Sequence, residues 1–167
     1  MKAYDIIILP PEDFYFSIND LYIKNYNLFV KIVKVLCKKY KNKKILIKFR
    51  NSDHKNLFNI QHNNVVTSGK ILDYANKNCK IIGPPGSIVI ESLLKGYNFY
   101  SYRAIINPRN KARVFGLNDV LEIANNEKKL MRNLSKNLIF KRGRNRNDLL
   151  HKKTLLLKDI VKEILKI

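Results

Sequence analysis

Residues 79–96 read CKIIGPPGSIVIESLLKG, and this stretch decides the fold. It begins with a short apolar run typical of a buried strand and continues into a turn that holds two glycines and two prolines. It then shows apolar residues at helical spacing, and Gly96 ends the helix. A strand that passes directly into a turn and a helix is the first part of a βαβ unit, so the stretch predicts a parallel sheet.

The rest of the chain repeats this alternation. Apolar runs bounded by turn residues predict strands at residues 4–9, 44–49, 64–67, 79–82 and 98–102. Helical spacing predicts helices at residues 20–40, 68–78, 87–95, 117–134 and 148–167. The expected fold is therefore an α/β, Rossmann-like domain of three layers, with a parallel sheet of about five strands and a helical, basic C-terminus. Residues 1–140 form the sheet domain, and residues 141–167 form a basic linker and a closing helix of the same domain.

Composition limits the classes of function. The chain has 167 residues, which fit one domain, and 33 basic against 13 acidic residues give a net charge of +20. Such an excess suits a polyanionic partner, but the bias of an AT-rich genome toward Lys, Asn and Ile explains it equally well, and no nucleic-acid-binding motif is present. Two cysteines without a CxxC pair and three histidines give no zinc ligand set, so neither metal nor cofactor is expected. No apolar run approaches the roughly 18 residues of a membrane span, and no signal-peptide pattern opens the chain, so a cytoplasmic location is expected.

The loops after the strands are the candidate site, because ligands of parallel sheets bind outside the carboxyl ends of the strands where strand order reverses. The turn after the fourth strand directs the N-terminus of its helix at that edge, and such an end attracts phosphate. We expect phosphate contacts there from Gly83, Pro84, Pro85, Gly86 and Ser87. The alternative is that this turn is only a tight connection with an ordinary capping serine.

Other residues of the same edge complete the candidate set. Glu91 lies one turn into the helix, where its carboxylate could accept the two hydroxyls of a ribose; the alternative is a solvated glutamate that complements the helix dipole. Ser68 and Gly69 follow the third strand and Arg103 follows the fifth, so they are candidate contacts for an anionic ligand. The aromatic residues at positions 97–102 could stack on a base, although core packing explains them better.

Two stretches within residues 44–102 resemble a known family. ILIKFRN at 45–51 and ILDYANKNCKIIGPPGSIVIESLLKGYNFYSY at 71–102 are similar to the C-terminal, nucleotide-sugar-binding half of B-type glycosyltransferases of bacterial capsular and surface polysaccharide synthesis, including sialyltransferase-like and polysialyltransferase-like groups. The resemblance implies that Gly86 and Ser87 meet the donor phosphates, that Glu91 binds the ribose, and that Lys48 or Arg50 counters the phosphate charge. Arg50-Asn51 stands where the family often has His-Pro, with His54 as a substitute.

The sequence thus leaves three functions open. The first is a donor-binding domain that transfers, or helps to transfer, a sugar from a nucleotide sugar to a surface-polysaccharide or glycolipid acceptor, together with a separate acceptor-binding chain. The second is a non-enzymatic basic module that binds nucleic acid or an anionic membrane surface through residues 127–167. The third is a doubly wound domain that has retained no ligand. No residue is assigned a catalytic role. Peripheral contact with the inner face of a membrane accompanies the first two functions, and nucleic acid is the less favoured partner.

Overall fold

A single parallel sheet forms the centre of the molecule. The structure is a computed structural model that describes residues 3–11, 20–50, 52, 55, 62–104 and 117–148. The strands are β1 (Tyr4–Ile8), β2 (Ile45–Lys48), β3 (Val65–Val66), β4 (Ala75–Gly83) and β5 (Asn98–Ser101). They pair in the order β3-β2-β1-β4-β5, and every pair is parallel. This sheet confirms the predicted α/β, Rossmann-like fold with five strands.

The position of β1 at the centre of the sheet explains why its residues 6–8 are continuously apolar. Ile7 lies opposite Leu46 of β2 on one side and opposite Ile81 of β4 on the other, and all three side chains are fully buried. A parallel strand in the middle of a sheet is covered on both faces, so alternation between apolar and polar residues is lost. Strand order reverses at β1, because the chain moves from β1 toward β3 on one side and from β4 toward β5 on the other.

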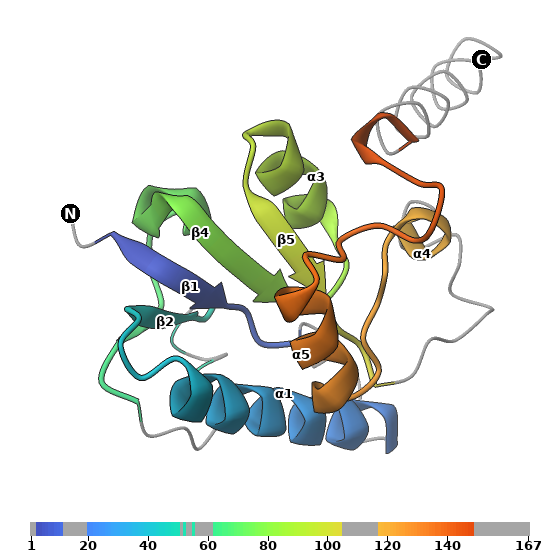
Figure 1. The fold of residues 1–167 in the computed structure, drawn as a ribbon. Coiled ribbons are helices and arrows are strands. Elements are labelled where there is room, and N and C mark those ends of the chain that lie inside the picture. Colours follow the sequence, from blue (N-terminus) through green and yellow to red (C-terminus); the bar gives the residue numbers. More distant parts are fainter. Residues whose placement is uncertain are drawn as a thin grey trace, which may run out of the picture.

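Helices cover both faces of the sheet, as Figure 1 shows. Helix α1 (Asp20–Lys39) joins β1 to β2, and α3 (Ser87–Leu94) joins β4 to β5 on the opposite side of the sheet. The short helix α4 (Leu117–Val120) and helix α5 (Glu127–Ser135) follow β5, and α5 packs against α1 and β5. The three layers are therefore helices, sheet and helices.

The helix predicted at 68–78 is wrong. Residues Ile71–Tyr74 form one 3₁₀ turn, and β4 begins directly after it at Ala75. Residues 67–74 must cross from β3 over two strands to β4, about 14 Å at the usual spacing of strands, and extended backbone spans more distance per residue than a helix does. Gly69 has a φ of +75°, and the Tyr74 hydroxyl donates a hydrogen bond of 2.9 Å to the carbonyl oxygen of Ser68. These features fix a bend, and Ser68 caps no helix.

The single helix predicted at 117–134 is also wrong, because it is two helices. Between α4 and α5 the chain runs beside the end of β5, and the backbone N–H of Ala124 donates to the carbonyl of Ser101 over 2.9 Å. Asn126 then caps α5, because its side-chain oxygen accepts a hydrogen bond of 2.8 Å from the backbone N–H of Lys129. An asparagine followed by Glu127 is a recognisable start signal for a helix, and the apolar spacing had masked it.

The remaining predictions fall partly outside the described residues. Residues 141–147 are exposed, while the closing helix predicted at 148–167 lies outside the described part of the chain beyond Asp148. Cys79 is buried and Cys37 half-buried, and burial raises the pKa of both thiols, that of Cys79 to about 12. None of the described helices has the length and apolar character to cross a membrane.

Candidate functional site

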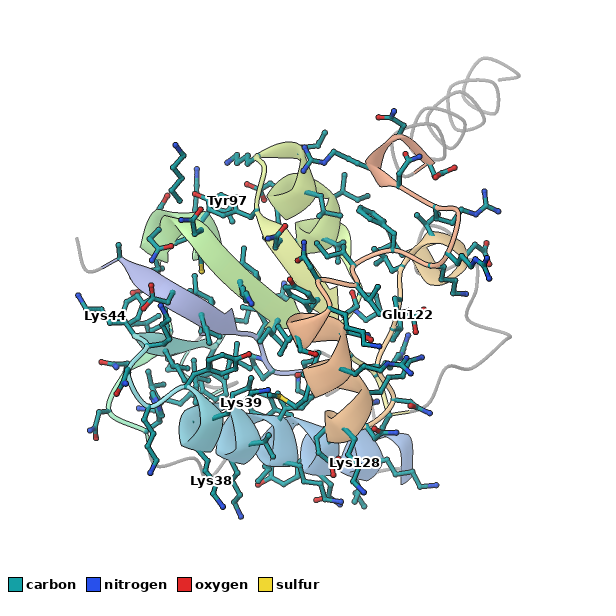
Figure 2. All side chains as sticks on the ribbon, in the orientation of Figure 1. Lys38, Lys39, Lys44, Tyr97, Glu122 and Lys128 are labelled. Atoms are coloured by element: carbon teal, nitrogen blue, oxygen red, sulfur yellow. The ribbon has the colours of Figure 1, made fainter. Side chains whose placement is uncertain are left out.

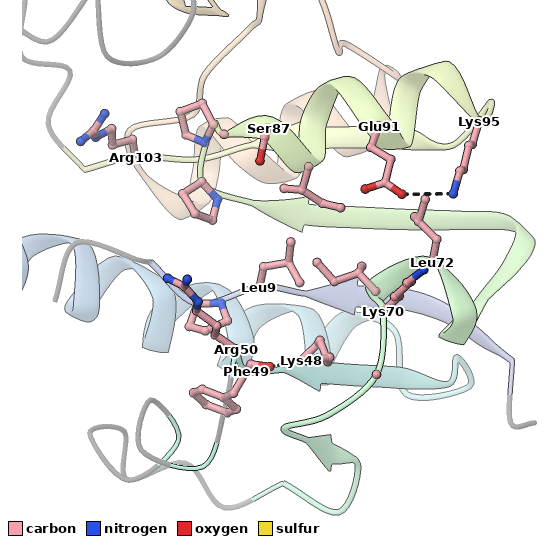
Figure 3. A pocket seen from close by; sticks show the side chains of 17 residues that line it. Leu9, Lys48, Phe49, Arg50, Lys70, Leu72, Ser87, Glu91, Lys95 and Arg103 are labelled. Atoms are coloured by element: carbon pink, nitrogen blue, oxygen red, sulfur yellow. Dashed lines mark hydrogen bonds and ion pairs between the residues drawn. The ribbon is translucent and has the colours of Figure 1, made fainter. Parts of the chain in front are cut away.

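A cavity of about 640 Å³ opens at the carboxyl edge of the sheet. The chain segments that follow all five strands contribute to it, and they meet on both sides of the point where strand order reverses. Figure 3 shows α3 along one wall, with β1 and β2 on the opposite side. The cavity therefore lies where the fold class places its ligands.

Positive charge dominates the lining. The basic lining residues are Lys48, Arg50, Lys70, Lys95 and Arg103, and the acidic lining residue is Glu91. They come from the end of β2 and the loop after it, from the β3–β4 crossover, from α3 and its C-terminal cap, and from the segment after β5. Charges from four different elements converge on one concave surface, and a concave surface of one sign concentrates its field on an oppositely charged ligand.

Lys48 is the buried member of this group. It is the last residue of β2, its exposed fraction is only 6 %, and its ammonium donates a hydrogen bond to the carbonyl oxygen of Phe49. Burial lowers the pKa of Lys48 from the ordinary value. Little water competes for the charge of a buried ammonium that borders a cavity. Such an ammonium would therefore bind an anion in the cavity more strongly than a surface lysine does.

The loop between β4 and α3 presents backbone rather than side chains. Gly86 is the residue that precedes the helix, its backbone is extended, and a Cβ atom built on it would meet no atom within 4 Å. Ser87 is the first helical residue and is exposed, so it is not the cap that its position suggested. The first N–H groups of an α-helix have no partner within the helix, and the open space at Gly86 allows a ligand to approach them.

Glu91 is already engaged by a neighbour. Its carboxylate lies 3.1 Å from the ammonium of Lys95, one turn further along α3, and both side chains are about half exposed. An exposed pair of this kind stabilises the protein little. Glu91 can therefore exchange this partner for a ligand, and Lys95 adds a cation beside it. The spacing of four residues between Glu91 and Lys95 was the sequence signal for this pair.

Most of the predicted binding residues come together in the structure. The cavity is lined by Lys48, Arg50, Gly69, Pro84, Pro85, Gly86, Ser87, Glu91 and Arg103. Gly83 is buried instead, and a Cβ atom on it would lie 3.0 Å from the Leu9 side chain and 3.2 Å from Phe99. Ser68 is exposed and does not line the cavity. The binding roles of all these residues stay predictions.

Sequence reasoning missed the lining residues of the crossover. Lys70, Ile71 and Leu72 face the cavity from a segment that was predicted as a regular helix. Their signal was Gly69, since a glycine one residue after Ser68 argues against a helix that starts there. Ile88 and Lys95 were also missed, because only Ser87 and Glu91 of this helix were considered as ligand contacts.

The aromatic residues after α3 take the core role that was preferred for them. Phe99, Tyr100 and Tyr102 are at most 1 % exposed, and they belong to the hydrophobic core. They cannot offer a face to a base.

His54 lies outside the described residues, and the described residues contain no cluster of three metal-binding side chains. No protein-family model, curated protein or solved structure matches this chain.

Proposed function

We propose that this domain binds a nucleotide sugar in the carboxyl-edge cavity and serves as the donor-binding part of a glycosyltransferase. One observation carries the proposal: basic side chains from several elements and the N-terminus of α3 converge on one cavity at the point where strand order reverses. That combination suits a phosphate or diphosphate group. The resemblance of residues 44–102 to nucleotide-sugar-binding domains is the reason to propose that the ligand carries a sugar and that this sugar is transferred.

In this reaction, the bond between the anomeric carbon of the sugar and the phosphate oxygen breaks, and the electron pair leaves with the nucleotide. The acceptor hydroxyl oxygen forms the new bond to that carbon and releases its proton to a base. Negative charge builds up on the departing phosphate, so Lys48, Arg50 and Arg103 and the N–H groups at the start of α3 are placed to stabilise it. The acceptor, a surface polysaccharide or glycolipid, and the base come from an acceptor-binding partner chain under this proposal.

Calorimetric titration with UDP-, GDP- and CMP-sugars tests the binding step. We expect saturable binding that weakens at least about tenfold in Arg103→Ala, since hydrogen bonds to charged groups contribute about 1.5–3 kcal/mol. Lys38→Ala is the matched control, because Lys38 is exposed on α1 and does not line the cavity. If none of the nucleotides or nucleotide sugars binds to the folded protein, the proposal is wrong.

A second candidate is the non-enzymatic basic module, and the surface of α1 favours it. Between Ile23 and Lys44 the chain contains no acidic residue, and all of its lysines there are exposed. Figure 2 shows Lys38 at the outer side of α1, away from the sheet, and Lys128 on the neighbouring α5. Residues 141–147 are exposed as well. Binding to RNA or to anionic vesicles that falls steeply with salt, without binding of any nucleotide, would favour this function over the first.

A further inference from the structure

The carboxyl-edge cavity has an apolar part that no predicted role uses. Leu9, Ile71, Leu72 and Ile88 line it beside the charged residues. Leu9 is 7 % exposed, and the other three side chains are half-buried. We call these four residues the apolar slot. They come from the end of β1, from the 3₁₀ turn and from the first turn of α3.

The slot exists because the β3–β4 crossover has no α-helix. In a regular βαβ unit a crossover helix packs on the sheet beside the next helix and fills this face. Here the 3₁₀ turn at Ile71–Tyr74 is the helical part of the crossover, and the cavity is lined both by this turn and by α3. The cavity therefore continues from the strand ends into the space between the 3₁₀ turn and α3.

The two ends of the cavity differ in chemistry. Figure 3 shows Arg50 and Arg103 toward one end, and Leu72 at the other end with Lys70 and the Glu91–Lys95 pair. A ligand that fills both ends needs an anionic group at the first and a group with apolar faces at the second. Glu91 and Lys95 offer one acceptor and one donor at the rim of the slot, so the second group also needs polar atoms at its edge.

We propose that the apolar slot holds the heteroaromatic base of the nucleotide, with Glu91 and Lys95 at the polar edge of the ring. The inference rests on the proposed function, since it assumes that the phosphates occupy the basic end. A nucleobase has two apolar faces and an edge of donors and acceptors, which is the combination that the slot presents. The proposal also moves Glu91 from the ribose to the base, because in Figure 3 its ion-pair partner Lys95 lies toward the same end of the cavity as Leu72, away from the start of α3.

Calorimetric titration of the whole chain with four probes separates this inference from the proposed function. The probes are inorganic pyrophosphate, UDP, GDP and farnesyl diphosphate. All four contain a diphosphate group, and they differ in what is attached to it. We expect pyrophosphate to bind and the better of UDP and GDP to bind about tenfold more tightly, as burial of one ring face predicts. If pyrophosphate and both nucleotides fail to bind, the proposed function is wrong.

Comparing the affinities for pyrophosphate and for the nucleotides decides whether the base occupies the apolar slot. If pyrophosphate binds and neither nucleotide binds more tightly, the base does not occupy the slot and this inference is wrong while the phosphate site stands. Tighter binding of farnesyl diphosphate than of either nucleotide overturns the inference too, because the slot would then hold an alkyl chain.

Two variants localise the effect. Leu72→Ala should remove most of the tenfold difference between nucleotide and pyrophosphate and leave pyrophosphate binding unchanged. Leu94→Ala is the matched control: Leu94 is on α3, is 48 % exposed and does not line the cavity. Equal effects of both variants on the difference between probes would contradict the assignment. Circular dichroism confirms that each variant is folded, and Ile88→Ala replaces Leu72→Ala if the latter is not.

Discussion

The hydroxyl of Tyr102 donates a hydrogen bond of 2.7 Å to the carbonyl oxygen of Leu9. The two residues are 93 positions apart in the chain, and Tyr102 is 1 % exposed. Leu9 follows the central strand β1 and lines the cavity, and its own N–H donates to Ile82 of β4. The hydrogen bond therefore fixes the segment after β1 between β4 and the end of β5, beneath the site.

Tyr102→Phe should lower the free energy of unfolding by about 1–2 kcal/mol. The substitution keeps the ring in the core but leaves the buried carbonyl of Leu9 without this donor. Urea denaturation followed by circular dichroism measures the change. Tyr97→Phe is a control, because Tyr97 is only half-buried. Equal stability of Tyr102→Phe and wild type would mean that the hydrogen bond does not contribute to folding.

The parts of the fold that local sequence patterns determine were predicted from the sequence. The first strand was found because residues 6–9 are a continuous apolar run, which a sheet covered on both faces buries, and the second because apolar and polar residues alternate at 44–49. The turn of residues 83–86 located the candidate site, because glycine and proline mark the β4–α3 connection directly.

The features that the sequence missed depend on tertiary contacts. The crossover at residues 67–74 is extended because it must pass two strands between β3 and β4, and local propensity contains no information on where those strands lie. Residues 121–124 have helical apolar spacing, yet Ala124 pairs with the end of β5. Tertiary hydrogen bonding outweighs a propensity difference of less than about 1 kcal/mol per residue. The apolar slot, which is built partly from the crossover, was hidden for the same reason.

Asp5 makes the stability of the protein sensitive to acid. Its carboxylate accepts hydrogen bonds of 2.9 Å from the backbone N–H of Lys44 and 2.7 Å from the Asn76 side chain. The Lys44 hydrogen bond, followed by that of Asn76, holds the pKa of Asp5 below the ordinary value of 3.8 against the opposing effect of burial. A lowered pKa in the folded state adds stability above the unfolded value, and this stability is lost as pH falls through the folded value.

Asp5→Ala should therefore destabilise the protein at pH 7, by about 1 kcal/mol or less because water screens this carboxylate, and by less still at an acidic pH at which the Asp5 of wild type also loses its charge. Denaturant titrations at both pH values measure the two differences. Asp73→Ala serves as the control, since Asp73 is exposed. A loss of stability in Asp5→Ala that is the same at both pH values would contradict a role for the carboxylate charge.

Replacement of Lys48 should change the stability of the protein little and weaken the binding of an anion strongly. Because burial lowers its pKa, the unfolded state binds more protons between the folded pKa and 10.5, so this residue makes wild type more stable as pH rises through that window. Lys48→Met removes the buried charge but also the donor to the Phe49 carbonyl, and we expect its unfolding free energy at pH 7 to lie within about 1 kcal/mol of wild type.

The stability difference between wild type and Lys48→Met should then move in favour of wild type as pH is raised from 7 toward 10.5. Comparing the two proteins at each pH cancels the contributions of other groups, such as Tyr100, whose pKa burial raises to about 12. Pyrophosphate affinity should fall at least about tenfold in the variant. A variant that binds pyrophosphate as well as wild type would remove Lys48 from the phosphate site.

Gly86→Ala tests whether a ligand approaches the backbone at the start of α3. Its φ of −167° and ψ of −172° are extended backbone that alanine adopts, and the added methyl group meets no atom within 4 Å. The unfolding free energy should therefore stay within about 0.5 kcal/mol of wild type, while the methyl group occupies space that a phosphate needs and lowers pyrophosphate affinity about tenfold. Gly69→Ala is the contrasting variant: Gly69 has a φ of +75°, and its Cβ atom would lie 2.6 Å from the Tyr74 hydroxyl, so it should lose more than about 1 kcal/mol of stability. Unchanged pyrophosphate affinity in a stable Gly86→Ala protein would show that the phosphates bind away from the N-terminus of α3.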